Sequence, residues 1–273
     1  MSAGDSVNGT AGDAVRHQDA RGEEAVAHLA SSFGFEEVEP TTKSGKVRAV
    51  FDSVAGRYDI MNDVMSMGVH RLWKEAMLDW LAPRAGRHYL DLAGGTGDIA
   101  QRLFDRIDGK ARITLVDINV SMLGAGRDRA LDNGWYAGID WIAGDAQSLP
   151  LADRSIDACT MAFGIRNVTR IDRALSEIRR VLRPGGRFVC LEFSRLRLAA
   201  LEGLYDRYSL DVLPIMGRLI AGDAESYRYL AESIRRFPDQ ETFAGLFREA
   251  GFERVSFRNL SGGIAALHSG WRL

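Results

Sequence analysis

The sequence predicts an α/β fold with a mostly parallel β-sheet, an antiparallel C-terminal hairpin, N-terminal helices and a helical insertion. Strand-like and helix-like patterns alternate from residue 87 onward, as they do in βαβ units. A glycine-rich loop follows the first of these strands, at the position where open α/β sheets bind ligands. The last two strand-like segments are joined across Gly262-Gly263, a dipeptide that favours a tight hairpin.

The part of the chain before the sheet is expected to hold a tail and a helical cap. Residues 1–30 are rich in Gly, Ala, Ser and charge, so we expect a disordered tail before a domain over residues 31–273. Within residues 46–82, apolar side chains recur at three- and four-residue spacing in two stretches, which predicts two amphipathic helices. These are Val47, Val50, Phe51, Val54 and Tyr58, then Leu72, Trp73, Ala76, Met77 and Trp80. Pro83 and Gly86 end the second helix.

Seven strands and their connecting helices follow. The expected strands are residues 88–92, 112–116, 139–143, 156–163, 187–192, 255–259 and 264–267. The expected helices are residues 98–104, 121–131, 170–181 and 240–250. Pro184-Gly185-Gly186 is expected to stop the third helix and Gly251 the fourth. Residues 196–237 interrupt the alternation with a long, aromatic and mostly helical insertion.

Composition excludes several classes of protein. The chain has 35 Lys and Arg against 37 Asp and Glu, so its charge offers no electrostatic case for nucleic acid as a partner. No signal peptide or uncharged membrane span is recognisable, which favours a cytoplasmic protein. Cys159 and Cys190 lie within apolar runs and are expected as buried strand residues, and no ligand-spaced Cys/His cluster predicts a metal site.

The loop Gly94-Gly95-Thr96-Gly97 predicts a site for a nucleotide-like ligand. Its glycines allow the backbone to approach a ligand, and the first amides of the next helix are free to donate hydrogen bonds. The dinucleotide pattern G-x-G-x-x-G is only approximated, with Ala100 in the third position. Asp91 and Asp98 flank the loop and would repel a pyrophosphate, whereas a carboxylate can hold an ammonium group. The two acids therefore favour S-adenosylmethionine over a nicotinamide dinucleotide.

Two more acids follow the next two strands. Asp117 ends the second strand, at a distance beyond the glycines that suits ribose hydroxyls. Asp145 follows the third strand and could accept the adenine amino hydrogens, while the Ala146 amide could donate to a ring nitrogen. The alternative is that each acid only caps the following helix. Their joint placement at successive strand ends favours the ligand site.

Longer stretches of the chain resemble the ubiquinone/menaquinone biosynthesis C-methyltransferase family. The matching stretches include DLAGGTGD from residue 91, VDIN from 116, GDAQSLP from 144, FGIRNV from 163 and VLRPGGRFVCLEFS from 181. Further stretches are residues 50–55, 58–59, 61–63, 70–74, 226–234, 237–240 and 266–268, so the resemblance runs from about Phe33 to the end. It implies the Rossmann-like fold of class I methyltransferases and S-adenosylmethionine as methyl donor. It also implies a polyprenylated benzoquinol or naphthoquinol as acceptor, methylated at a ring carbon.

The resemblance assigns cofactor contacts to Thr96, Asp117, Asp145 and Ala146. A serine that makes a further contact in the family is replaced here by Ala162, so its hydroxyl is absent. With the residues singled out above, the predicted cofactor set is Asp91, Gly94, Gly95, Thr96, Asp117, Asp145, Ala146 and Ala162.

Arg166 and Asn167 are the candidate catalytic residues, because they follow the fourth strand on the rim where the methyl group should lie. Methylation of an aromatic carbon requires a quinol hydroxyl to lose or share its proton. Arginine is no neutral base, but it could stabilise a quinolate or order a water that takes the proton. The alternative for Arg166 is a surface salt bridge to the next helix. Tyr58 and Asp59 are further candidates from the N-terminal helix.

The resemblance also implies partners. Residues 196–237 would form a lid or groove for the polyprenyl tail, or meet the membrane, although an ordinary core helix explains the same pattern. We expect peripheral contact with the inner membrane, a place in a quinone-biosynthesis complex and a homo-oligomer. A nicotinamide dehydrogenase and a non-catalytic scaffold are the alternative functions.

Overall fold

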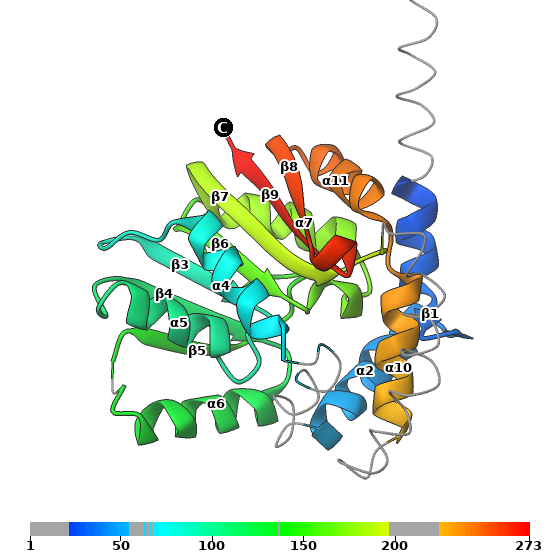
Figure 1. Cartoon of the computed structure of the whole chain (residues 1–273), viewed down its shortest axis with the longest axis horizontal. Helices are drawn as coiled ribbons and strands as arrows, with labels where there is room; N and C mark the ends of the chain where they lie inside the picture. Colours follow the sequence, from blue (N-terminus) through cyan, green and yellow to red (C-terminus); the bar gives the residue numbers. More distant parts are fainter. Residues whose placement is uncertain (1–21, 55–62, 64–65, 67, 136, 197–223) are drawn as a thin grey trace, which may run out of the picture.

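The computed structural model describes residues 22–54, 63, 66, 68–135, 137–196 and 224–273 of the chain. Its centre is a seven-stranded sheet with the strand order β5-β4-β3-β6-β7-β9-β8 (Figure 1). The strands are β3 (His88–Leu92), β4 (Arg112–Asp117), β5 (Ile139–Ala143), β6 (Ile156–Ala162), β7 (Leu182–Phe193), β8 (Glu253–Leu260) and β9 (Ala265–Arg272). The first five are parallel, and β9 pairs antiparallel with both β7 and β8. The predicted fold class is confirmed.

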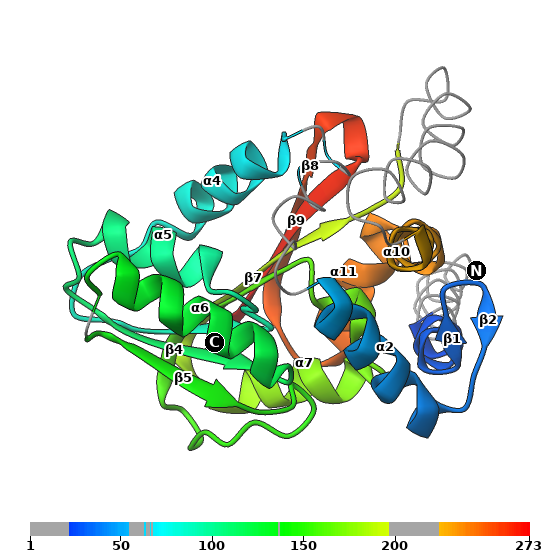
Figure 2. The same ribbon diagram turned by 90° about the horizontal axis from the view of Figure 1, so that it is seen from below.

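Helices cover both faces of this sheet. They are α2 (Pro40–Val54), α4 (His70–Leu81), α5 (Asp98–Arg106), α6 (Val120–Asp132), α7 (Ile171–Val181), α10 (Ala224–Arg236) and α11 (Gln240–Glu249). Side chains of a strand point to alternate faces, so Tyr89 packs in a core with α4 and α5, whereas Leu90 packs with α7 and α11. Figure 2 shows α4 and α7 on opposite sides of the sheet. Helices α2 and α10 lie side by side beyond the carboxyl ends of the parallel strands (Figures 1 and 2).

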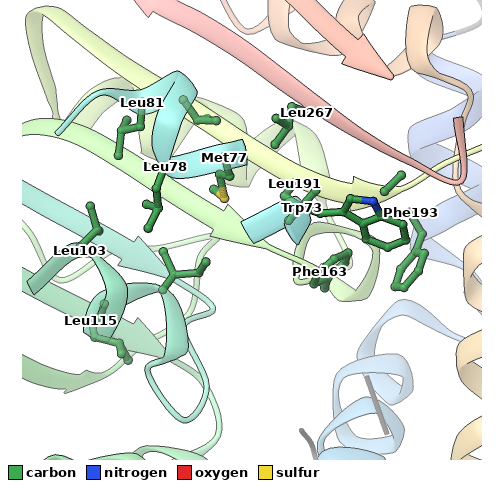
Figure 3. Close-up of a cluster of buried hydrophobic side chains, with 14 of the residues drawn as sticks. Trp73, Met77, Leu78, Leu81, Leu103, Leu115, Phe163, Leu191, Phe193 and Leu267 are labelled. Atoms are coloured by element: carbon green, nitrogen blue, oxygen red, sulfur yellow. The ribbon is translucent and has the colours of Figure 1, made fainter. Parts of the chain in front are cut away.

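Helix α4 supplies much of one core. Figure 3 shows its apolar side chains against β7 and β9 and near Phe163, which follows β6, and Phe193, the last residue of β7. The labelled residues are Trp73, Met77, Leu78, Leu81, Leu103, Leu115, Phe163, Leu191, Phe193 and Leu267. The expectation that Leu72 shares this face is wrong, because its side chain is 68% exposed. Trp73, Met77 and Leu81 follow one another at four-residue spacing, and Leu72 precedes them by about 100° around the helix.

Several element bounds differ from the prediction. Strand β7 begins at Leu182 and runs through Pro184-Gly185-Gly186, which was expected to be a helix stop outside the strand. A register shift between Ile156 and Ala158 of β6 accommodates this segment, as bulges accommodate proline in sheets. Strand β9 extends to Arg272, well beyond the predicted end, because it pairs with a neighbour on each side. The β8–β9 connection is a four-residue turn between Leu260 and Ala265.

The N-terminal region is more ordered than expected. Residues 22–30 are helical, and Leu29 is only 3% exposed, so the predicted tail is wrong for this part. The Lys43 ammonium donates to the Leu29 carbonyl oxygen at 2.6 Å, which ties this helix to α2. A small sheet of β1 (Ser32–Phe33) and β2 (Glu36–Glu37) follows, and α2 begins at Pro40, a residue favoured in the first turn. Residues 1–21 lie outside the described residues.

The helical insertion is described only in part. Residues 224–236 form α10, whose Tyr227 and Leu230 are fully buried, whereas residues 197–223 lie outside the described residues. Within the described chain, no helix combines the length and the apolar character needed to cross a membrane. Cys159 and Cys190 are free and buried in β6 and β7, as expected.

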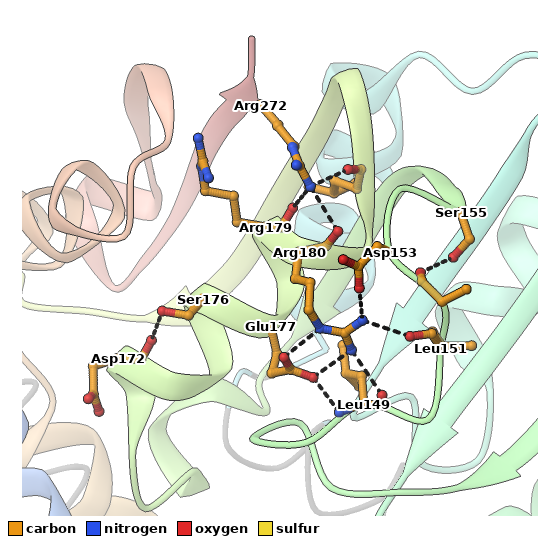
Figure 4. A network of polar contacts seen from close by, with 12 residues as sticks. Leu149, Leu151, Asp153, Ser155, Asp172, Ser176, Glu177, Arg179, Arg180 and Arg272 are labelled. Atoms are coloured by element: carbon orange, nitrogen blue, oxygen red, sulfur yellow. Dashed lines mark hydrogen bonds and ion pairs between the residues drawn. The ribbon is translucent and has the colours of Figure 1, made fainter.

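Arg180 and Arg272 form a network of hydrogen bonds and ion pairs near the point where α7 leads into β7. Arg180 of α7 bonds to Glu177 and Asp153 and to two carbonyl oxygens of the loop 149–151 (Figure 4). Arg272 of β9 donates to the carbonyl oxygens of Arg179, Arg180 and Leu182, where α7 ends (Figure 4). Carbonyls at the end of a helix lack partners within it, so Arg272 caps α7.

Candidate functional site

The glycine loop turns sharply at the carboxyl end of β3. Ala93 and Gly95 have positive φ angles of 52° and 55°, and a Cβ atom on Gly94 would lie 2.6 Å from Leu115 Cγ. Phe163, directly after β6, also has a positive φ of 57°. Non-glycine residues rarely adopt this conformation, and such strain gathers at functional sites.

A cavity with about 780 Å³ of free space, partly open to solvent, lies against this loop. A second hollow of about 530 Å³ continues from it and shares Asp117, Ile118 and Gly164 with it. Of the predicted site residues, Asp91, Gly94, Gly95, Thr96, Asp117, Ala162 and Asn167 line the first hollow, and Asp117, Asp145, Ala146 and Asn167 line the second. The structure therefore brings all eight predicted cofactor residues to one elongated site.

Helix α2 closes one side of the cavity, where Val47, Arg48 and Phe51 line it. The helix is anchored by Asp52, whose Oδ1 accepts a hydrogen bond from Asn119 Nδ2 at 2.9 Å. Asn119 also caps α6, since its Oδ1 accepts from the Met122 amide at 3.0 Å. The same residue thus joins the N-terminal cap to the strand end that carries Asp117.

The carboxylate of Asp117 holds the glycine loop through a backbone hydrogen bond. Its Oδ2 accepts from the Gly95 amide at 2.8 Å, and its Oδ1 accepts from the Asn119 amide at 2.7 Å. Burial raises the pKa of this carboxyl, and the two amides oppose the shift. Asp145 is less buried and accepts from the Gln147 amide at 2.9 Å. Asp117 and Asp145 thus line the cavity and also accept hydrogen bonds from nearby backbone amides.

Asp91 is fully enclosed at the base of the loop. Its Oδ1 accepts from Thr160 Oγ1 and its Oδ2 from the Ala100 amide, each at 3.0 Å. These bonds join β3 to β6 and to α5. Burial raises the pKa of Asp91 to about 7.

Asp98 lines the first hollow and is ion-paired through both carboxylate oxygens. Its Oδ2 lies 2.6 Å from Lys74 Nζ and its Oδ1 lies 2.8 Å from Arg102 Nε. These cations hold the pKa of Asp98 below its usual value against the effect of burial. A ligand ammonium at Asp98 would therefore share the carboxylate with two cations of the protein, and this contact stays a prediction.

Arg166 lies behind the cavity rather than on its wall. Its Nη1 lies 2.7 Å from Glu192 Oε1 and donates to the Phe163 carbonyl oxygen at 2.6 Å, and both charged side chains are 1% exposed. Burial raises the pKa of Glu192, and Arg166 offsets part of that shift. The alternative of a surface salt bridge to the next helix is also wrong, since the pair is buried and reaches β7.

Asn167 is the candidate catalytic residue that does line the cavity. Its Oδ1 accepts a hydrogen bond from the Tyr229 hydroxyl of α10 at 2.9 Å. Tyr229 is 4% exposed, and burial raises its pKa. Tyr58 and Asp59 lie outside the described residues.

Sequence reasoning missed Lys74, Glu192 and Tyr229. Lys74 stands between Trp73 and Met77 on the buried stripe of its helix, and Glu192 interrupts an apolar strand. A charge within an apolar pattern signals a buried partner, so both could have been singled out. Tyr229 carries no comparable signal.

Comparison with known proteins matches residues 39–272 to the ubiE/COQ5 methyltransferase family. The chain is 61% identical over 241 residues to the ubiquinone/menaquinone biosynthesis C-methyltransferase UbiE of Paracoccus denitrificans, covering 88% of this chain and 96% of that protein. It is 56% identical over 251 residues to the protein of the same name from Brucella abortus (strain S19), covering 91% and 93%.

Solved structures share the fold at low sequence identity. A SAM-dependent methyltransferase from Thermotoga maritima, described as a possible histamine N-methyltransferase, superposes with a TM-score of 0.60 at 21% identity, covering 83% of this chain and 100% of that one. A SAM-dependent methyltransferase from Aquifex aeolicus gives 0.55 at 15% identity, covering 73% and 89%. These likenesses establish the class I methyltransferase fold.

Proposed function

The chain belongs to the ubiE/COQ5 methyltransferase family, and from that membership we propose that it transfers a methyl group from S-adenosylmethionine to a ring carbon of a polyprenylated quinol. This is the C-methylation of ubiquinone/menaquinone biosynthesis, with a benzoquinol or a naphthoquinol as acceptor. The observation that carries the donor is the elongated cavity, whose polar groups can be matched along its length to the adenine, the ribose and the methionine end of S-adenosylmethionine.

The two hollows give this ligand a direction. Asp145 and Ala146 lie in the second hollow and suit the adenine amino group and a ring nitrogen. Asp117 lies where the hollows meet and suits the ribose hydroxyls. The first hollow, with Gly94 and Thr96, then remains for the methionine end and the sulfonium.

The charge of the first hollow supports the same ligand. Its wall carries three carboxylates, Asp91, Asp98 and Asp117, and two cations, Arg48 and Lys74. S-adenosylmethionine has a sulfonium, an ammonium and one carboxylate, so it offers groups of both signs to a wall that carries both. A pyrophosphate offers only negative charge to these carboxyl groups, which argues against the nicotinamide alternative.

Methyl transfer from the bound sulfonium is an in-line displacement by the ring carbon. The protein contributes alignment within a cavity whose other walls are apolar, formed by Val47, Phe51 and Phe163. Holding two reactants in line can by itself supply a large part of a rate enhancement.

Activation of the ring requires the quinol hydroxyl to give up or share its proton. Asn167 can bond this oxygen through its amide Nδ2, while Tyr229 fixes its other end. Arg166 acts through the backbone: it holds the Phe163 carbonyl and so positions the strand-end turn that carries Asn167. We assign Asn167 the contact with the acceptor and Arg166 a positioning role.

The test uses the full chain, isotopically methyl-labelled S-adenosylmethionine and each demethyl quinol in turn. We expect labelled product with at least one quinol, and a rise in melting temperature with S-adenosylhomocysteine but not with NAD. Binding of S-adenosylhomocysteine without transfer to either quinol would contradict the acceptor, and stabilisation by NAD alone would contradict the donor. Membrane contact, assembly into a complex and homo-oligomerisation stay predictions.

A further inference from the structure

Lys74 is a buried cation on the wall of the first hollow. Its side chain is 4% exposed, and it extends from α4 toward the glycine loop. Its Nζ lies 2.6 Å from Asp98 Oδ2 and 6.0 Å from the centroid of the Phe163 ring. Lysine is almost never this buried unless it is paired, and here the pairing with Asp98 permits the burial of Lys74.

The ammonium of Lys74 retains unused capacity. Within the described part of the chain, Asp98 is the one acceptor that it bonds, and an ammonium carries three N–H donors. The cavity side of Lys74 can therefore accommodate a further acceptor. A buried donor without a partner is unfavourable, so a ligand oxygen placed there would gain from the contact.

Asp98 does not depend on Lys74 alone. Its other oxygen is held by Arg102 at 2.8 Å, and Arg102 also pairs with Glu75 of α4. Arg102 does not line the cavity, whereas Lys74 and Asp98 do. Lys74 can therefore bind a ligand as well, because Asp98 keeps Arg102 as a counter-ion.

The direction of the ligand places its carboxylate near Lys74. With adenine beside Asp145 and ribose beside Asp117, the methionine end occupies the hollow that Asp91 and Asp98 also line. A ligand carboxylate there would be repelled by both acids unless a cation stood between them. Of the two cations on the wall, Arg48 is exposed to solvent, so Lys74 offers the stronger, less screened interaction.

We propose that Lys74 binds the carboxylate of the methionine moiety of S-adenosylmethionine. Asp98 is then the counter-ion that orients the ammonium group of Lys74. The inference rests on the proposed function and adds a specificity-determining residue to the same site. It follows that the protein selects donors with an intact amino-acid end.

The test compares calorimetric binding of S-adenosylmethionine and decarboxylated S-adenosylmethionine to the full chain. The decarboxylated compound keeps the sulfonium and the ammonium and lacks only the carboxylate. We expect the wild-type protein to prefer S-adenosylmethionine, and Lys74→Gln to lose about 10- to 100-fold of that affinity, the size of a charge-assisted hydrogen bond. The same variant should bind the decarboxylated compound as the wild type does, and Lys74→Arg should recover part of the preference.

Arg102→Gln is the matched control, because it also removes a cation from Asp98 but lies off the cavity. It should leave the preference between the two compounds unchanged. Equal loss of affinity for both compounds in Lys74→Gln would overturn the proposal and indicate a structural role. A wild-type protein that binds both compounds equally would overturn it too, while leaving the methyltransferase assignment intact; failure to bind either compound would instead contradict the proposed function.

Discussion

Arg166, which precedes α7, and Arg180, in the last turn of α7, form ion pairs that differ sharply in exposure to water. Arg166 precedes the helix at the cavity end of the sheet, where its side chain and that of Glu192 are each 1% exposed. Arg180 lies near the helix end, where its side chain is 31% exposed and those of Glu177 and Asp153 are 21% and 72% exposed. Both pairs have N···O distances near 2.7 Å. Short distance therefore does not distinguish them, and their contributions must be judged from desolvation.

The comparison indicates different roles for the two pairs. Removing two charges from water is costly, so a buried pair adds little net stability but becomes very destabilising when one partner is lost. An exposed pair is screened and contributes little either way. The buried pair Arg166–Glu192 therefore fixes the turn after β6 at a cost in desolvation. The exposed pairs of Arg180 only connect surface loops to α7.

The largest expected effect comes from breaking the buried pair on one side. Glu192→Ala leaves the Arg166 guanidinium enclosed without a counter-ion, and should lower the free energy of unfolding by about 3–5 kcal/mol. Urea unfolding measures this. The double variant Arg166→Met, Glu192→Leu removes both charges and should recover most of the loss. If Glu192→Ala unfolds like the wild type, the pair is not buried as described.

The next effect in size is expected at Asn167, which follows the turn that the Arg166–Glu192 pair positions, and it concerns turnover. Asn167→Ala should reduce turnover about 10²-fold, because it removes a donor from the site where negative charge develops. Its melting temperature should fall by only a few degrees, because the buried Tyr229 hydroxyl loses its acceptor. Tyr229→Phe, which removes the hydroxyl that orients Asn167, should give an intermediate loss of turnover. Normal turnover in Asn167→Ala would contradict its contact with the acceptor.

Asp91 offers a buried acid with no cationic partner among the described residues, and so a pH test. Its pKa of about 7 in the folded protein exceeds the unfolded value near 4, so the folded state binds the proton more tightly. Its contribution to the free energy of unfolding is therefore largest below pH 4 and decreases as the pH rises to 7. The isosteric variant Asp91→Asn removes this titration. The difference in unfolding free energy between wild type and variant should change across pH 4–7, and a constant difference would refute the shift.

The smallest effect is expected at the exposed network. Asp153→Ala removes a partner of Arg180 whose side chain is mostly in water, while Glu177 remains. The free energy of unfolding should fall by less than about 1 kcal/mol, and less still in high salt. A loss as large as that in Glu192→Ala would erase the contrast between the two ends of α7.

The sequence predicted best what depends on local pattern. The bounds of β3 and β5 match the prediction, and the acids at the strand ends meet at one site because parallel strands share their carboxyl edge. Alternating side chains and turn residues carry this information over a few positions. Family resemblance then supplied the methyl donor and the quinol acceptor.

The missed features depend on contacts between distant residues. The burial of Arg166 follows from Glu192, 26 positions away on a neighbouring strand, and the helix at residues 22–30 is held by Lys43 of α2. The pairing of Asp98 with Lys74 joins two helices across 24 positions, so spacing along the chain does not reveal it. Arg102 lies four residues after Asp98 in the same helix, and that pair could have been recognised from the sequence.

The position of the transferred methyl group tests the proposed C-methylation most directly. Incubation with S-adenosylmethionine carrying a ¹³C-methyl group and a demethyl quinol, followed by ¹³C NMR of the product, distinguishes a methyl on a ring carbon from one on an oxygen. Methyl transfer to the ring carbon gives an aryl methyl signal, which is the expected result. A methoxy signal, or unlabelled quinol beside a protein that binds the donor, would contradict C-methylation by this site.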